Sequence, residues 1–157
     1  MKTKEMLIVM REAGERNHER EQEWKEQQDE SLLRMLLIDV QHGEAKIVRI
    51  KDDLDEFYRL IDCNTIDIVR RSIGGRTFEI ICDDNGLFRS DCRTSAMDEH
   101  MNQQFVGNLL ICRYGGNGEL AGLTTSDVAH LAKYLRTVRK LRDPAEAWPA
   151  LYNVEYC

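Results

Sequence analysis

Two adjacent glycines, Gly74 and Gly75, stand between two segments rich in β-branched and aromatic residues, TIDIVRRS (65–72) and RTFEIICDD (76–84). Glycine adopts positive φ angles without steric cost, so a glycine pair between two such runs predicts a tight β-hairpin. In the second run the apolar residues Phe78, Ile80 and Cys82 occupy alternate positions. Because alternate side chains share one face of a strand, this chain is expected to form an antiparallel sheet with an apolar face to bury.

Further segments on both sides extend this pattern. MLLIDVQ (35–41) and AKIVRIK (45–51) flank His42-Gly43-Glu44 and predict a second hairpin. LDEFYRLI (54–61) has apolar residues at helical spacing and follows Asp52 and Asp53, either of which can cap a short helix. FVGNLLICRY (105–114) returns to the composition of a strand.

The second half of the chain predicts one loop and one long helix. The polar segment 89–104 has no clear periodicity and is expected to be a loop. TTSDVAHLAKYLRTVRKLRD (124–143) offers Thr125 or Ser126 as an N-cap, places Asp127 in the first turn, and repeats apolar residues every three or four positions. This spacing predicts an amphipathic helix that continues to residue 143.

These elements predict an α+β fold, in which a four to five-stranded, mainly antiparallel sheet is covered by two helices, with an appended N-terminal charged helix. The domain spans residues 35–143, and an aromatic C-terminal tail (144–157) packs on it. Residues 1–34 hold seven Lys/Arg and nine Asp/Glu, and Trp24 is the only large apolar residue between Gly14 and Ser31. Such a helix is a solvated arm, a strut anchored at its ends, or a segment that packs against a partner, including a second copy of the chain.

Three motifs follow one another in a fixed order. They are the hairpin from Ile68 to Ile80 around the glycine pair, the acidic turn DDNGL (83–87), and the late strand VGNLLI (106–111). In these motifs the stretch from Leu36 to Leu131 resembles an uncharacterised small domain family of phages, conjugative elements and Firmicutes, particularly gut clostridia. The family usually has Glu where Asn85 stands here. The resemblance implies an α+β domain carried by a mobile genetic element, where small proteins often block host defence or regulate transfer.

Composition and motifs exclude several classes of function. A net charge of −6 argues against a general electrostatic grip on nucleic acid or membrane, and the five cysteines form no CxxC pair. The N-terminus lacks the features of a secretory signal, and no apolar run approaches the length of a membrane span, so we expect a cytoplasmic location. The glycine runs match no phosphate-binding motif, and His18, His42 and His130 have no partners at metal-ligand spacing. We therefore expect no enzyme, cofactor or metal.

Basic residues supply the candidate binding site. Seven of them lie on the glycine hairpin and in the last predicted helix: Arg70, Arg71, Arg76, Lys133, Arg136, Arg139 and Lys140. Together they would form a basic patch on an acidic chain, suited to nucleic acid or to an acidic protein surface. Alternatively, the basic residues of the last helix only complement its macrodipole. Trp24 or the aromatic tail would act as an anchor in an interface.

The leading hypothesis is a non-catalytic binding protein of phage or mobile-element origin. It would inhibit a host defence complex, such as a restriction or CRISPR-type nuclease, by occupying a protein or nucleic-acid surface. An alternative is a small-ligand or nucleotide-signal binding domain, with its site between the 83–104 segment and the sheet. A further alternative is a structural or regulatory subunit.

Overall fold

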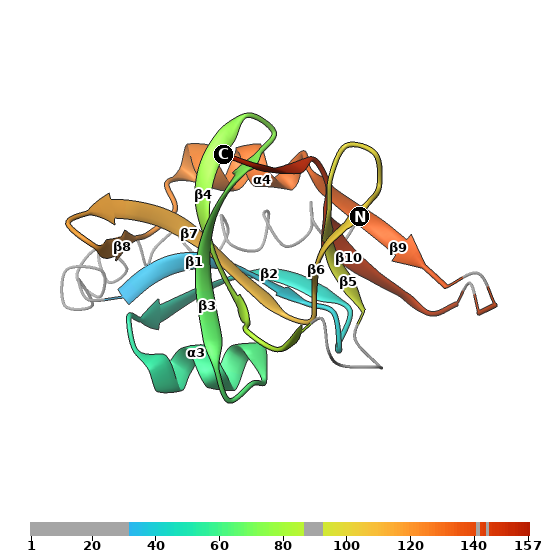
Figure 1. The fold of residues 1–157 in the computed structure, drawn as a ribbon, viewed down its shortest axis with the longest axis horizontal. Coiled ribbons are helices and arrows are strands. Elements are labelled where there is room, and N and C mark those ends of the chain that lie inside the picture. Colours follow the sequence, from blue (N-terminus) through green and yellow to red (C-terminus); the bar gives the residue numbers. More distant parts are fainter. Residues whose placement is uncertain (1–31, 87–92, 141, 144) are drawn as a thin grey trace, which may run out of the picture.

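The computed structural model describes residues 32–86, 93–140, 142–143 and 145–157, which form two β-sheets and two helices (Figure 1). Residues 1–31 of the predicted charged arm, including Trp24, lie outside the described residues. The homodimer predicted through that arm falls on the same residues. No helix in the described part is long and apolar enough to cross a membrane.

Sheet A holds seven strands and forms the centre of the fold. Its order is β11-β3-β4-β7-β1-β2, and β8 pairs with the far end of β7. All its pairings are antiparallel. The strands are β1 (Leu32–Asp39), β2 (Glu44–Lys51), β3 (Ile66–Ile73), β4 (Arg76–Asp83), β7 (Leu109–Gly116), β8 (Glu119–Ala121) and β11 (Val154–Tyr156). The two hairpins predicted from the sequence, β1–β2 and β3–β4, are confirmed.

Sheet B holds four strands in the order β6-β5-β10-β9, and its β5–β10 pair is parallel. The strands are β5 (Thr94–Met97), β6 (Gln103–Val106), β9 (Leu135–Arg139) and β10 (Ala147–Leu151). The expected total of four to five strands is therefore too low, and the described residues are mostly β with two helices. The predicted loop at 89–104 is wrong where it covers β5 and the start of β6. These strands have only four residues each, too few for a periodicity to show.

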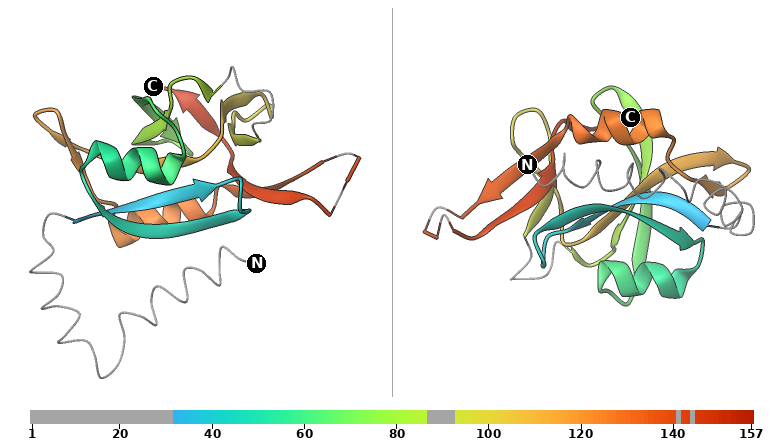
Figure 2. Two further views of the ribbon diagram at one scale, coloured as in Figure 1. Left: turned by 90° about the horizontal axis from the view of Figure 1, so that it is seen from below. Right: turned by 180° about the vertical axis from the view of Figure 1, so that it is seen from behind.

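The central strands β1, β7 and β4 of sheet A are buried on both faces, which explains their long apolar runs. Leu36, Ile111 and Ile80 are aligned across β1, β7 and β4, and they face the core shared with helix α4 and sheet B. Leu37 and Leu110 lie one residue along and face the opposite core, beneath helix α3. Figure 2 shows α3 and α4 on opposite sides of this sheet.

Helix α3 (Leu54–Ile61) is confirmed at its predicted position. The Asp53 carboxylate accepts a hydrogen bond from the Asp55 N–H at the start, and Asp62 ends the helix in the left-handed conformation. Phe57 and Ile61 are buried against sheet A.

The long helix predicted up to residue 143 is wrong, because α4 (Thr125–Ala132) ends after eight residues. Thr124, one residue before the predicted caps, forms a capping box with Asp127. At the other end the Tyr134 carbonyl accepts a bond of 2.7 Å from the Tyr152 N–H, and the chain continues as β9. Pairing with β10, the next strand along the chain, outweighs the local helical periodicity of residues 135–139.

Strands β9 and β10 form a two-stranded ribbon that projects from the body of the molecule (Figure 2). Five residue pairs join the strands, from Leu135 with Leu151 to Arg139 with Ala147. The ribbon is anchored by Trp148, which is buried and donates a hydrogen bond of 2.8 Å from Nε1 to the Thr94 carbonyl. Beyond β10, the chain enters sheet A as β11 after only two residues.

Candidate functional site

The seven basic residues singled out by the sequence occupy two separate sheets. Arg70 and Arg71 lie on β3, and Arg76 lies at the start of β4, all in sheet A. Arg136 and Arg139 lie on β9 of sheet B, while Lys133 and Lys140 flank this strand. These four residues therefore lie on or beside the projecting ribbon and not along the predicted long helix.

Arg70 lines a groove of about 440 Å³ on the α3 side of sheet A. Its guanidinium is 2.9 Å from the carboxylate of Glu79, whose side chain is only 7% exposed, and it lies 4.6 Å from the centroid of the Tyr114 ring. Burial, followed by the charges of Glu79 and Asp52, raises the pKa of the adjacent Cys112 thiol to about 12. The groove therefore contains the Glu79 carboxylate, paired with the Arg70 guanidinium that stacks on Tyr114.

Arg71 lies between two rings. Its guanidinium is 4.3 Å from the centroid of Tyr156 and 5.6 Å from that of Phe105, and it donates a bond of 2.8 Å to the Arg70 carbonyl. Tyr156 is 73% exposed, so one ring of this arrangement faces solvent. Arg71 ties the C-terminal strand β11 to β3.

Arg76 is committed to the start of α4. It lies 3.0 Å from the Asp127 carboxylate, which Arg113 also approaches at 3.0 Å from β7. Burial raises the pKa of Asp127, but bonds from Thr124 and the two arginines outweigh this effect and hold that pKa below its ordinary value. Arg76 therefore joins a helix to the sheet in the folded protein.

Two residues of the second basic group, Arg136 and Arg139, line a groove of about 530 Å³ beside β9. Its lining combines cations, an aromatic ring and methionines: Met97, Met101, Arg136, Thr137, Val138, Arg139 and Tyr152. Met101 is 60% exposed and leaves the groove open on one side. We call this the ribbon groove.

Arg136 and Tyr152 contact each other in the ribbon groove. The guanidinium carbon of Arg136 lies 5.0 Å from the Tyr152 ring centroid. Nη1 of Arg136 donates to the carbonyls of Lys133 at 2.8 Å and Leu135 at 3.0 Å, and the Tyr152 hydroxyl donates to the Glu99 carbonyl at 3.0 Å. Both flat groups are therefore held in position before any ligand arrives.

Lys140, the residue that follows β9, is part of an ion-pair cluster. Its ammonium lies 3.3 Å from Glu146, which also bonds Arg93. The hydrogen bond from Arg93 is the main cause of the lowered pKa of Glu146. Arg93 also stacks on Trp148, at 4.7 Å from its ring, so this cluster connects the ribbon to β5.

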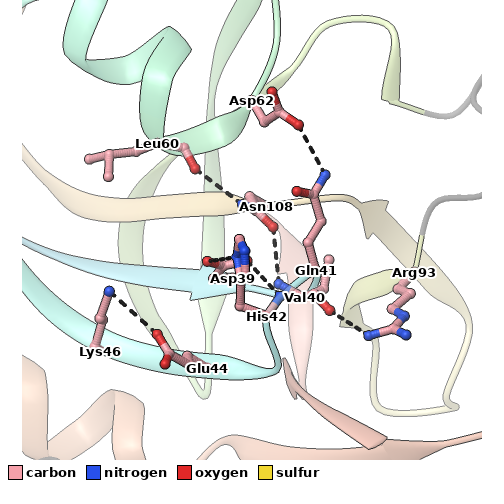
Figure 3. Close-up of polar contacts among 10 residues, drawn as sticks. All are labelled: Asp39, Val40, Gln41, His42, Glu44, Lys46, Leu60, Asp62, Arg93 and Asn108. Atoms are coloured by element: carbon pink, nitrogen blue, oxygen red, sulfur yellow. Dashed lines mark hydrogen bonds and ion pairs between the residues drawn. The ribbon is translucent and has the colours of Figure 1, made fainter. Parts of the chain in front are cut away.

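A second polar cluster surrounds the β1–β2 turn, shown in Figure 3. The buried Asn108 accepts a bond of 3.0 Å from the Val40 N–H and donates one of 3.1 Å to the Leu60 carbonyl. Asp39 accepts a bond from the His42 N–H and lies 2.8 Å from Nδ1 of the same histidine. These contacts join β1, β7 and α3. Within the residues described, no group of three His, Cys, Asp or Glu side chains is placed to hold a metal ion.

Sequence reasoning missed the methionines and Tyr152 as lining residues of the ribbon groove. Met97 and Met101 lie in the segment expected to be a loop, and Tyr152 was noted only as part of an aromatic tail. The sequence feature that points to Tyr152 is the aromatic tail, in which Tyr152 follows Trp148 and Pro149. No local pattern shows that this tail pairs with residues 135–139.

A family model described as Domain of unknown function (DUF3846) matches residues 33–138. The matched span contains both helices and ends within β9, whereas β10 and β11 lie beyond it. No curated protein and no solved structure gives a significant match.

Proposed function

The chain belongs to the family described as Domain of unknown function (DUF3846), which names no reaction, and from that premise we propose that it is a non-catalytic binding protein. It inhibits a host defence complex, such as a restriction or CRISPR-type nuclease, by occupying a nucleic-acid or protein surface. It acts in the cytoplasm and originates from a phage or another mobile element. Its binding surface is the ribbon groove.

The observation that carries this proposal is the meeting of Arg136, Arg139 and Tyr152 at one groove on a projecting ribbon. Residues 133–143 contain five basic residues and one acidic residue in a chain of net charge −6. Positive charge concentrated on one protruding element attracts a polyanion, while the remaining acidic surface repels it elsewhere.

Fluorescence anisotropy with labelled DNA and RNA tests the binding surface. Arg136→Glu should weaken binding about tenfold at low salt, because it replaces an attraction to phosphate with a repulsion. Arg59→Glu makes the same charge reversal on an exposed residue of α3 and should leave binding almost unchanged. Equal losses in the two variants would show that net charge alone controls binding.

A plasmid-interference assay tests inhibition in a host that carries a restriction or CRISPR-type nuclease. Expression of the wild-type chain should restore transformation by targeted plasmids, and Arg136→Glu should not. Pull-down of the nuclease with the wild-type chain, analysed in parallel, would support the same conclusion. If interference persists and no nuclease associates, the proposed inhibition is wrong.

The groove at Arg70 favours a second function, the binding of a small ligand or nucleotide signal, although its lining includes no residue of the 83–104 segment beside which the sequence predicted such a site. It contains a buried carboxylate, an aromatic wall and an open volume of about 440 Å³, which is in the range of ligand sites. A thermal-shift screen with nucleotides and cyclic dinucleotides tests this alternative, because a ligand at 100 times its Kd adds about 2.7 kcal/mol of stability.

A further inference from the structure

We infer that the ribbon groove binds an unpaired base of a single-stranded nucleic acid. This inference rests on the proposed function and names the ligand class of the same site. Its occupant is one nucleotide within a strand, with the base in the groove and the adjacent phosphates on the ribbon cations.

The Arg136–Tyr152 stack supplies the surface for a base. Bases that are not paired stack on aromatic side chains and on the planes of arginine guanidinium groups. Here both kinds of surface lie together, with the guanidinium carbon 5.0 Å from the ring centroid. Backbone carbonyls hold both side chains in place, so ordering them costs little on binding.

The remaining walls suit a flat, largely apolar body. Met97, Met101 and Val138 line the groove, and its volume of about 530 Å³ falls within the range of small-ligand sites. Methionine is flexible and polarisable, and it adapts its contacts to aromatic groups. In a duplex the faces of the bases are covered by their neighbours, so only an unpaired base can use these walls.

The cations around the groove fit the phosphates on either side of such a base. Arg139 lines the groove, and Lys133 precedes β9 at the other end of the strand. An acidic protein surface would satisfy these charges equally well. It would leave the tyrosine ring and the methionines without a matching partner, because carboxylates have no flat apolar face. The combination therefore favours nucleic acid over acidic protein.

The test compares three probes on the full chain: a single-stranded oligonucleotide of about 12 nucleotides, its duplex, and poly-glutamate. The single strand should bind most tightly. Tyr152→Leu should weaken single-strand binding about tenfold without changing the slope of log K against log salt, because stacking releases no counterions. Tyr152→Phe should retain most of the affinity, since the ring is kept.

The matched control is Tyr156→Leu, which removes the exposed ring that stacks with Arg71 on sheet A and lines neither groove. It should leave single-strand binding unchanged. Thermal unfolding of every variant separates a lost contact from a lost fold. If Tyr152→Leu does not fold, Arg136→Lys tests the stack, because it keeps the charge, removes the flat guanidinium surface and should weaken single-strand binding.

Several outcomes would overturn the inference. Equal binding of duplex and single strand, or equal losses in Tyr152→Leu and Tyr156→Leu, would show that the groove does not bind a base, although a basic binding surface would remain. Binding of poly-glutamate or of the nuclease alone would overturn the inference and leave inhibition through a protein surface. If no probe binds and interference also persists, both the inference and the proposed function are wrong.

Discussion

Of the glycines compared, Gly74 has the least room for a side chain. Its φ is +58°, and a Cβ built on it would lie 2.1 Å from Cζ of the Tyr134 ring. We expect Gly74→Ala to lower the free energy of unfolding by about 2–5 kcal/mol, the sum of a left-handed alanine and an overpacked contact. Urea denaturation measures this loss.

Gly75 provides the matched control within the same turn. Its φ is +83°, but a Cβ there meets nothing within 4 Å. Gly75→Ala should therefore cost only the backbone strain, about 1–2 kcal/mol. Equal losses at the two glycines would contradict the predicted clash with Tyr134.

The glycine pair also shows what single residues reveal before the structure is known. A turn at Gly74-Gly75 follows from the conformational freedom of glycine, and the structure confirms it. The contact with Tyr134 does not follow from the sequence, because it joins residues 60 positions apart through the end of α4.

At the scale of elements, Asp127 joins α4 to sheet A and gives the fold a dependence on pH. Because its pKa is lower in the folded protein, its contribution to stability is complete above its unfolded pKa of about 4 and is lost as the pH falls through the folded pKa. Asp127→Asn should cost about 1.5–3 kcal/mol near neutral pH, and this difference should shrink below about pH 4.

Urea denaturation at neutral and acidic pH measures this dependence. Asp55→Asn makes the same change at an exposed position in the first turn of α3 and should alter stability by only a few tenths of a kcal/mol. A cost for Asp127→Asn that stays constant down to about pH 3 would show that its charge is not the stabilising feature.

Local elements were predictable where the local pattern agreed with the long-range pairing. Helix α3 and the two hairpins of sheet A each rest on caps, glycines or alternation within a few residues. Residues 135–139 have helical periodicity but form β9, because their partner β10 begins at Ala147 and is itself fixed by the buried Trp148. A pattern read within one segment contains no information about such a partner.

At the scale of the whole molecule, two buried cysteines report on the opposite cores of sheet A. Burial, followed by the charge of Asp67, raises the pKa of Cys82 to about 12, and Cys112 reaches a similar value. Thiols with such pKa values hold almost no thiolate near neutral pH, so they should react only when the sheet opens. The exposed Cys157 should react at once.

Alkylation followed by mass spectrometry of the peptides measures each rate. We expect Cys82 and Cys112 to be labelled at the same rate and with the same dependence on urea, because β4 and β7 pair directly. A Cys82 rate about tenfold faster would show instead that the core shared with α4 and sheet B opens separately.

The candidate site could be predicted only in part from the sequence. The excess of basic residues in 133–143 is visible without a structure, and it contains Arg136 and Arg139 of the ribbon groove. The opposite walls come from Met97 and Tyr152, which reach the same place only because β5, β10 and β9 lie side by side. The basic residues of 133–143 can be identified from the sequence, whereas the shape of the groove depends on how β5, β10 and β9 pair.

Burial of the central strands of sheet A on both faces has a consequence for the fidelity of folding. A slip of β1 by one residue against β7 would exchange Leu36 for Leu37 and still bury an apolar side chain on each face. Hydrophobicity therefore discriminates poorly between the native pairing and an erroneous one. Asn108 makes the error costly, because a slip removes the Val40 N–H from its amide oxygen. A single polar side chain, Asn108, therefore favours the native register of β1 against β7 over a register shifted by one residue.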